Sequence, residues 1–366
     1  MKLKRCLSYI TLVLCALMML YFGLQNKVFA QLPSYQQLKS NYDGSFPEKN
    51  RFLELNAAFS KALGRRELNR VVNLGSVSYL QDSPADNLEQ KADAVAALSK
   101  AKVPFAFVYL PTLLRSDAPA LRPYQFAEAG ESAAAFFRAL QGRGIAAYDL
   151  ADYRTDLPLQ QRYFKSDHHW LPQYAFLCAE PIAEIAARRL GITLESSVFD
   201  IVNYDAEILP QILLGTAGKR VGRLFTGLDD VTLLLPKFAT EFTLYSDLRR
   251  EGQSGSFAEL FVDRKSYLTP NFYEDNPYKV YMGDDARHMR VVNHRAANDK
   301  RVMLLIDSYS QVLIPFLANA FYELDVYDLR YFDGAILEEI KLRQPDMIIM
   351  QYTHYALDDP KCFEIR

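Results

Sequence analysis

The segment with the clearest chemical potential is residues 165–170, whose sequence is KSDHHW and which holds two of the five histidines of the chain. Asp167 and His169 are two positions apart, so in an extended backbone their side chains point to the same side. A carboxylate beside an imidazole holds the ring in one tautomer and stabilises its protonated form. The pair is therefore suited to act as a general base that activates a hydroxyl group.

Two other interpretations of this segment stay open at this point. Asp167 or Ser166 would cap the helix that follows, while the histidines fill an interface. Alternatively, Asp167, His168 and His169 would together hold a metal ion. Adjacent ligands on one short segment are poorly placed around a metal, and the sequence shows no further acidic cluster, so no metal site is expected.

A second candidate is the corner at residues 304–310 (LLIDSYS), where a buried strand ends and a helix begins. Ser308 in such a corner lies at the carboxyl edge of the sheet, near N–H groups at the helix start that can face an oxyanion. Asp and Ser are also preferred helix caps, which is the structural alternative. Together with Asp167 and His169, Ser308 completes the set of a Ser–His–Asp hydrolase or acyltransferase.

The elements that must position these residues alternate between apolar strands and amphipathic helices. Such an alternation predicts an α/β fold with a parallel sheet that helices cover on both faces. Ligands then gather at the carboxyl ends of the strands. The expected strands are residues 103–110, 145–150, 302–306, 323–327 and 346–351. The expected helices are residues 87–100, 132–141, 171–190, 311–320 and 335–342.

Residues 196–298 interrupt this alternation with many aromatic residues, several Gly and Pro, and short alternating runs such as residues 241–245 (EFTLY). Short alternating runs are typical of strands with one buried face. We therefore expect one domain over residues 31–366 that carries an irregular, β-rich insertion or lid at about residues 196–298.

The first 30 residues have the pattern of an export signal. A positive start at Lys2, Lys4 and Arg5 is followed by an uncharged run from Cys6 to Leu24. This run exceeds the roughly 7–15 apolar residues of a cleavable signal and approaches the roughly 20 of a spanning helix. We expect a signal anchor over residues 1–30 that makes the protein a single-pass cell-membrane protein with an extracytoplasmic domain. Cleavage after Ala30, which would release a secreted protein, is the alternative.

Composition excludes several classes of function. Half of the residues are apolar and 13% are aromatic, so the chain has enough material for a core and is not disordered. The formal net charge of −2 provides no basic field for nucleic acid. Of the four cysteines, Cys178 and Cys362 lie in the exported part, where an oxidising compartment permits a disulfide. Two buried free thiols are the favoured interpretation, and no Cys/His spacing indicates zinc.

The Asp-His-His-Trp sequence at residues 167–170 resembles the signature that names the DHHW family of bacterial exported proteins. The resemblance continues, in the order of that family, through most of residues 40–355. It includes residues 103–111, which end in Leu-Pro, Asp307-Ser308-Tyr309 followed by residues 314–317 (IPFL), and residues 328–331 (DLRY).

This family is similar to the SGNH-hydrolase-like proteins that O-acetylate alginate and other exopolysaccharides. In those relatives an Asp-x-His pair precedes the serine, an order that is permuted relative to ordinary SGNH hydrolases. The resemblance implies a three-layer SGNH-like fold in which Ser308 is the nucleophile, His169 the base and Asp167 the residue that orients the base. It also implies that His168 is an intervening residue and that Trp170 packs beside the site.

The chain departs from the SGNH pattern around the oxyanion. Ile306 occupies the position of the glycine that precedes Asp-Ser in ordinary SGNH enzymes, and no SGNH-type asparagine is assigned. An oxyanion hole must then use the Ser308 N–H with another donor, either the Tyr309 N–H or Arg330. Arg330 and Tyr331 would line the pocket, or Arg330 would form an ion pair with Asp328.

These observations predict an extracytoplasmic O-acyltransferase, with acetyl as the transferred group, or an esterase, acting on a cell-surface polysaccharide. By resemblance to the alginate system, a membrane-bound O-acyltransferase would pass the acyl group across the membrane, and no cofactor is expected. The alternative is a non-catalytic glycan-binding or polysaccharide-assembly factor on the same scaffold. In that case the aromatic-rich residues 196–298 would form a sugar-stacking surface, although aromatic residues are more often part of a core.

Overall fold

A computed structural model describes residues 17, 49–80, 85–113, 127–248, 251–264, 267, 270–283 and 285–366. The predicted signal anchor at residues 1–30 lies, except for Leu17, outside the described residues. In the part of the chain that is described, no helix combines the length and the apolar composition needed to cross a membrane.

The centre of the fold is an eight-stranded sheet in the order β5-β4-β13-β11-β12-β10-β8-β9. Its first five strands run parallel to one another, as the α/β alternation predicted. These strands are β5 (Ala147–Asp149), β4 (Phe105–Tyr109), β13 (Met347–Tyr352), β11 (Arg301–Ile306) and β12 (Glu323–Tyr327).

The predicted parallel sheet is only part of the whole sheet, which is mixed, because three further strands extend it through antiparallel pairings. They are β10 (His288–Asn293), β8 (Phe242–Ser246) and β9 (Gln253–Gly255), all from the predicted insertion. Antiparallel strands need no crossover helix and can leave one face in contact with water. In β8, Phe242 and Leu244 are accordingly buried while Tyr245 is exposed, as the alternating EFTLY sequence indicates.

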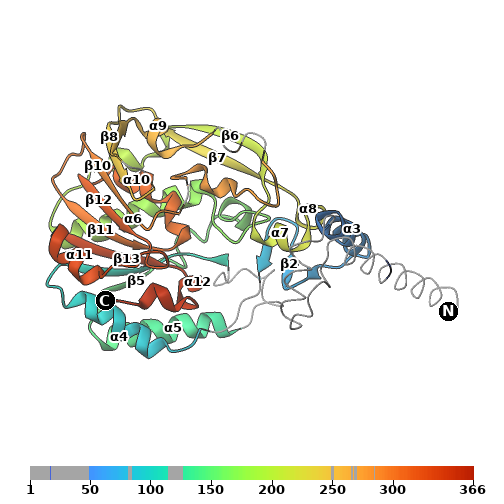
Figure 1. The fold of residues 1–366 in the computed structure, drawn as a ribbon, viewed down its shortest axis with the longest axis horizontal. Coiled ribbons are helices and arrows are strands. Elements are labelled where there is room, and N and C mark those ends of the chain that lie inside the picture. The colour runs from blue at the N-terminus through green and yellow to red at the C-terminus, as the bar shows by residue number, and fades with distance from the viewer. Residues whose placement is uncertain are drawn as a thin grey trace, which may run out of the picture.

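Helices cover both faces of the parallel strands, so the domain has three layers (Figure 1). Along β11, Val302 and Leu304 face one core, and Met303 and Leu305 face the other. The first core contains α6 (Pro172–Leu190) and α10 (Ile314–Ala318), and the second contains α4 (Leu88–Ser99), α5 (Ala127–Gly142) and α11 (Ile336–Arg343).

The helix expected at residues 311–320 is divided into two pieces. A 3-10 helix, η7 (Ser308–Val312), follows β11 directly, and α10 begins at Ile314 with Pro315 in its first turn. Proline lacks the N–H that a continuous helix needs at this point but fits a helix start. The division therefore follows from Pro315.

The remaining elements come mostly from the N-terminal part of the domain and from the predicted insertion. Two strands form a separate antiparallel ribbon, β6 (Tyr204–Leu213) with β7 (Asp229–Pro236). A three-stranded sheet comprises β1 (Glu67–Leu68), β2 (Val71–Asn73) and β3 (Ser78–Leu80). The other α-helices are α3 (Lys49–Ala62), α7 (Thr216–Val221), α8 (Arg223–Thr226), α9 (Phe257–Phe261) and α12 (His354–Leu357). The other 3-10 helices are η2 (Leu159–Gln161), η3 (Ser196–Phe199), η4 (Ile201–Asn203), η6 (Pro277–Val280) and η8 (Pro360–Phe363).

Cys178 and Cys362 are buried free thiols, which confirms the favoured interpretation over a disulfide. Cys178 lies in the core on one face of the sheet and Cys362 in the core on the other. Because the sheet separates them, the two sulfurs cannot approach the bond length of about 2 Å.

Candidate active site

The Asp-His-His-Trp segment forms a tight loop immediately before α6. An isolated β-bridge between Tyr163 and Trp170 closes the loop, and the Phe164 N–H donates to the His169 carbonyl at 3.3 Å. Pro172 then starts α6, where its missing N–H leaves no helical bond unmade. The β-bridge and the start of α6 therefore hold the two ends of the loop, and Asp167 and His169 lie between them.

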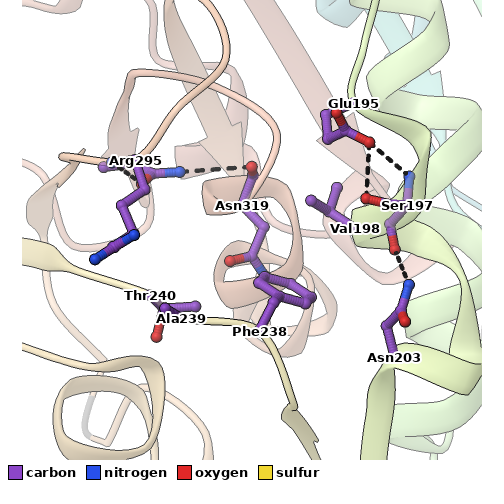
Figure 2. A pocket seen from close by; sticks show the side chains of 10 residues that line it. Glu195, Ser197, Val198, Asn203, Phe238, Ala239, Thr240, Arg295 and Asn319 are labelled. Atoms are coloured by element: carbon purple, nitrogen blue, oxygen red, sulfur yellow. Dashed lines mark hydrogen bonds between the residues drawn. The ribbon is translucent and has the colours of Figure 1, made fainter.

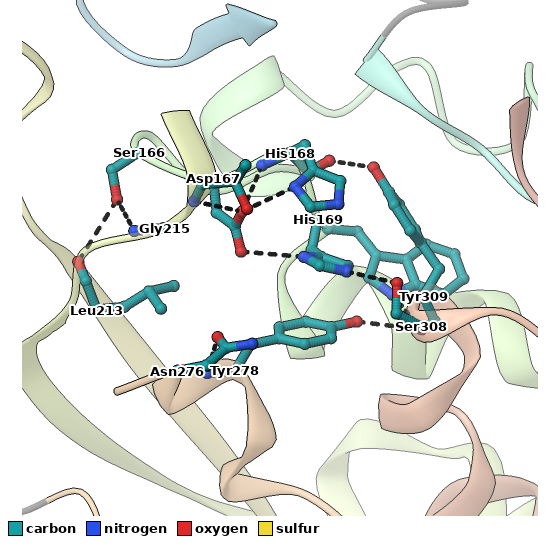
Figure 3. A network of polar contacts seen from close by, with 12 residues as sticks. Ser166, Asp167, His168, His169, Leu213, Gly215, Asn276, Tyr278, Ser308 and Tyr309 are labelled. Atoms are coloured by element: carbon teal, nitrogen blue, oxygen red, sulfur yellow. Dashed lines mark hydrogen bonds and ion pairs between the residues drawn. The ribbon is translucent and has the colours of Figure 1, made fainter. Parts of the chain in front are cut away.

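Asp167, His169 and Ser308 lie in one chain of hydrogen bonds (Figure 3). Asp167 Oδ2 is 3.0 Å from His169 Nδ1, and His169 Nε2 is 3.0 Å from Ser308 Oγ. Asp167 is 2% exposed and His169 is 5% exposed, whereas Ser308 is half-buried. The structure thus brings together the three residues that the sequence singled out, although 139 positions separate His169 from Ser308.

Ser308 is positioned by the end of β11 and by the cap of η7. Asp307 accepts a hydrogen bond from the Tyr309 N–H at 3.0 Å. Its other oxygen accepts from the Thr353 N–H at 2.8 Å and from the Thr353 hydroxyl at 2.6 Å. Thr353 follows β13, the neighbour of β11, so Asp307 ties two strand ends together. Ser308 consequently lies at the carboxyl edge of the parallel strands, as predicted.

The electrostatics of the loop keep His169 neutral and Asp167 ionised near pH 7. Burial and the charge of His168 lower the pKa of His169 to about 4, although Asp167 acts in the opposite direction. Burial opposes the charge on Asp167, yet His169 and His168 hold the pKa of its carboxyl well below the ordinary value. The ionised carboxylate accepts from His169 Nδ1–H, which leaves Nε2 free to accept the Ser308 proton.

The predicted insertion positions Asp167, the carboxylate of the hydrogen-bond chain that leads to Ser308. Thr216 N–H, at the start of α7, donates to Asp167 Oδ1 at 3.0 Å. The preceding Gly215 passes so close that an added Cβ would lie 2.1 Å from the Asp167 Cβ. The Gly215 N–H also donates to Ser166 Oγ at 2.9 Å. This part of residues 196–298 therefore supports the loop that carries Asp167.

A second support comes from Asp229, the first residue of β7. Its carboxylate accepts the Lys165 N–H at 2.6 Å and the Ser166 N–H at 2.7 Å. Burial raises the pKa of Asp229, while its hydrogen bonds to Ser166 and Lys165 act against the rise. These bonds fix the backbone immediately before Asp167.

Tyr278, in η6, stacks on the imidazole of His169 with ring centroids 4.0 Å apart and an angle of 19° between the planes. Its hydroxyl donates to the Tyr309 carbonyl at 3.1 Å, and Trp170 Nε1–H donates to the same carbonyl at 3.0 Å. The Tyr309 hydroxyl in turn donates to the His168 carbonyl. Trp170 thus packs beside the site, as the resemblance implies.

Sequence reasoning missed Gly215, Thr216, Asp229, Tyr278 and Thr353. Gly215 and Thr216 are 48 or 49 positions away from the residues that they contact, Ser166 and Asp167, and neither belongs to a motif with a known spacing. Tyr278 is one of 46 Tyr and Phe residues, so its type alone does not distinguish it. Only the contacts made by the folded chain reveal these residues.

The three expected donors to an oxyanion, which are the Ser308 N–H, the Tyr309 N–H and Arg330, differ in whether they already bind another group. The Tyr309 N–H already donates a hydrogen bond to Asp307, so it is not free to donate to an oxyanion. The Ser308 N–H makes no hydrogen bond to any described residue and stays available. Arg330 binds Asp328 through two nitrogens, at 2.9 and 2.5 Å, as the ion-pair interpretation expects.

Arg330 nevertheless remains within electrostatic reach of the site. Burial is the main cause that lowers the pKa of His169, and the charge of Arg330 adds to it. Burial raises the pKa of Asp307, and the charge of Arg330 counteracts that rise. The guanidinium also lies 5.2 Å from the ring centroid of Tyr331, which is 43% exposed. His168 is 3.0 Å from Asp167 Oδ1 through its Nδ1 and packs against His169. Contacts of Arg330, Tyr331 or His168 with a substrate stay predictions.

Asp167, His168 and His169 are also the one set of close potential metal ligands among the described residues, with ligand atoms within 4.8 Å of one another. The carboxylate oxygens already accept four hydrogen bonds, two of them from the histidine rings. A metal ion would have to displace these bonds. The arrangement therefore suits a base–acid pair better than a metal centre.

A separate polar cavity of about 380 Å³ lies at the other end of the helical segment that Ser308 begins (Figure 2). Asn319, which follows α10, lines it together with Asn203, Phe238, Thr240 and Arg295. Because β12 starts shortly after Asn319, the cavity lies near the amino ends of the parallel strands.

Residues 76–220, which include Asp167 and His169 but not Ser308, match a family described as the SGNH hydrolase-like domain of the acetyltransferase AlgX. No curated protein matches the chain in sequence. A DHHW family protein from Eubacterium siraeum shares 18% identity with a TM-score of 0.61, over 82% of this chain and 96% of its own. PatB1 from Bacillus cereus, solved with a sulfonyl adduct, shares 18% identity with a TM-score of 0.64, over 82% and 99%.

At such identities the two solved structures establish a common fold. The match to the SGNH hydrolase-like family covers the loop that carries the Asp-His-His-Trp motif. Residues 76–220 thus resemble an SGNH hydrolase-like domain, and the resemblance of the chain to DHHW proteins and to SGNH-hydrolase-like acetyltransferases, predicted from that motif, is confirmed.

Proposed function

We propose that this protein is an extracytoplasmic O-acyltransferase that acetylates a cell-surface polysaccharide, with Ser308 as nucleophile, His169 as base and Asp167 as the residue that orients the base. The observation that carries the proposal is the continuous hydrogen-bond chain from Asp167 through His169 to Ser308. The acetyltransferase description of the matching family supports the same class of reaction.

In the first half-reaction His169 Nε2 takes the Ser308 proton while Ser308 Oγ attacks the acyl carbonyl of a donor ester. The oxyanion that forms faces the Ser308 N–H. His169 then gives its proton to the oxygen of the leaving alcohol, and the bond between that oxygen and the acyl carbon breaks. The products are acyl-Ser308 and the free alcohol, and His169 is neutral again.

In the second half-reaction a sugar hydroxyl attacks acyl-Ser308 while His169 takes the hydroxyl proton. The Ser308 Oγ–acyl bond breaks, and His169 returns the proton to Ser308. The product is an O-acetylated sugar. With water as acceptor the same residues hydrolyse the ester, which is the esterase form of the proposal. A membrane-bound O-acyltransferase would present the acyl group on the outer side.

The test uses a chromogenic acetyl ester, with and without an oligosaccharide acceptor, on the full chain and its Ser308→Ala and His169→Ala variants. We expect turnover that both substitutions abolish, and acceptor-dependent formation of sugar ester if transfer prevails over hydrolysis. A sulfonyl fluoride should also label Ser308 in the native chain and not in Ser308→Ala. Equal turnover and equal labelling in all three proteins would reject the proposal.

The alternative function is a non-catalytic glycan-binding factor. The polar cavity favours it, since amides of Asn203 and Asn319, the Thr240 hydroxyl and the Phe238 ring are groups that bind sugars (Figure 2). The sugar-stacking surface expected from residues 196–298 receives less support, because many of its aromatic residues are buried. Retained glycan binding with no Ser308-dependent turnover would favour this alternative.

A further inference from the structure

Helix α3 exposes the large apolar side chains that a helix of a globular domain usually buries. It packs inward through Ala57 and Ser60, whereas Leu55 and Phe59 are each 66% exposed and Leu63, just beyond the helix, is 56% exposed. Residues four positions apart lie on one face of a helix, so the three side chains form a stripe. A contiguous exposed apolar stripe of this kind indicates an interaction surface.

The stripe continues into a groove of about 570 Å³ between α3, α8 and the segment before η6. Leu55, Leu224 and Phe272 supply its apolar lining. The groove and the stripe, defined by Leu55, Phe59, Leu63, Leu224 and Phe272, are here called the α3 face.

Helix α3 is fixed to the domain and cannot turn to bury this face. Ala57 packs in a small core with Ala217 and Val221 of α7. Glu54 accepts the N–H groups of Arg223 and Leu224 at 3.1 and 2.9 Å. These contacts hold α3 with the α3 face exposed.

The charge around the α3 face points to an anionic partner. Residues 49–70 carry six Lys and Arg against two Glu, a net charge of +4 in a chain whose total is −2. Lys61, Arg65, Arg66 and Arg70 are exposed. A second copy of the chain would place this positive charge opposite itself in a symmetric dimer, which opposes association.

An apolar stripe of Leu and Phe that is followed in the sequence by exposed arginines has the composition of helices that lie in the headgroup region of an anionic bilayer. The position in the chain agrees, because only residues 25–48 separate the uncharged run that ends at Leu24 from the start of α3. In Figure 1, α3 lies at the N-terminal end of the view, opposite α11.

We propose that the α3 face docks onto the surface of a bilayer that contains anionic lipid and holds the domain against that surface. The stripe enters the headgroup region, and Arg65, Arg66 and Arg70 contact lipid phosphates. Because α7 packs against α3 and its first N–H binds Asp167, the docked face and the candidate active site share one scaffold.

The test places a tryptophan in the α3 face of the full chain. Phe59→Trp and, as a matched control, Leu342→Trp are reconstituted in vesicles of brominated phosphatidylcholine mixed with phosphatidylglycerol. Leu342 is 71% exposed on α11, and the single native tryptophan, Trp170, is fully buried, so its emission is a constant background. We expect quenching at position 59 that is several-fold stronger than at position 342.

Further lipid mixtures and variants distinguish an anionic bilayer from a second copy of the chain as the partner of the α3 face. Replacing phosphatidylglycerol by phosphatidylcholine, or introducing Arg65→Gln with Arg66→Gln, should weaken the quenching at position 59 several-fold. Equal emission at positions 59 and 342 in folded protein would overturn the proposal. So would quenching that ignores lipid charge, and so would a concentration-dependent emission shift at position 59 in detergent, which would assign the face to a second copy.

Discussion

The two halves of the candidate active site are built in different ways. Ser308 stands at the end of a regular strand, and the bonds of Asp307 tie it to the next strand of the same sheet. Asp167 and His169 stand on an irregular loop that depends on Thr216, Asp229 and Tyr278 from a distant segment. The candidate nucleophile is thus positioned by the main sheet, and the candidate base–acid pair by residues of the predicted insertion.

Substitutions at the residues proposed to react, and at the residues that hold them in place, test this comparison. The largest loss of turnover is expected when Ser308, the proposed nucleophile, is replaced. Ser308→Ala should reduce ester turnover at least about 10³-fold, because it removes the hydroxyl that we propose forms the acyl intermediate. Thermal unfolding should stay close to that of the native chain, since Ser308 contributes little packing. Ser310→Ala, a buried serine two positions away, is the matched control and should retain most of the turnover.

Substitution of Asp167 should cause the next largest loss of turnover. Asp167→Asn is expected to reduce kcat by about 10²- to 10⁴-fold, because an amide no longer selects the tautomer of His169 that accepts the Ser308 proton. The shape of the side chain is preserved, so Gly215 and Thr216 keep their positions. Steady-state kinetics with a chromogenic ester measure the loss. A change confined to KM would contradict the role assigned to Asp167.

A substitution in the predicted insertion, at Gly215 beside Asp167, should give an intermediate effect. Gly215→Ala places a Cβ against Asp167 and should lower the free energy of unfolding by about 1–3 kcal/mol, with a loss of turnover because the loop must shift. Gly142→Ala, where an added Cβ meets nothing within 4 Å, is the control. Chemical denaturation and ester turnover measure both. If the two variants behave alike, the loop does not rely on the close approach at Gly215.

The smallest effect concerns pH. Burial, with the charge of His168, lowers the pKa of His169 to about 4, so the base is neutral above that pH and protonated below it. The acid limb of kcat/KM should therefore lie near pH 4, with a plateau at higher pH. His168→Gln removes a like charge and should move this limb to higher pH. A native limb near the ordinary histidine value of about 6.5 would contradict the buried, neutral base.

Local patterns in the sequence were sufficient for the parts of the fold that depend on neighbours in the chain. The apolar run of β11 and the polar corner after it placed Ser308 at the carboxyl edge of a sheet. Asp167 and His169 do contact each other, as their spacing of two indicated, although the backbone between them forms a bent loop and is not extended. These features follow from backbone geometry and hydrophobic periodicity, which operate over a few residues.

Only the tertiary structure decided how distant segments meet. No pattern in residues 196–298 indicated that β8, β9 and β10 would extend the main sheet, or that Gly215, Asp229 and Tyr278 would enclose the base–acid loop. No sequence pattern indicated the hydrogen bond from the Tyr309 N–H to Asp307 either. Such contacts arise from the packing of whole elements against one another, and their energy depends on shapes and distances that residue types along one chain do not contain.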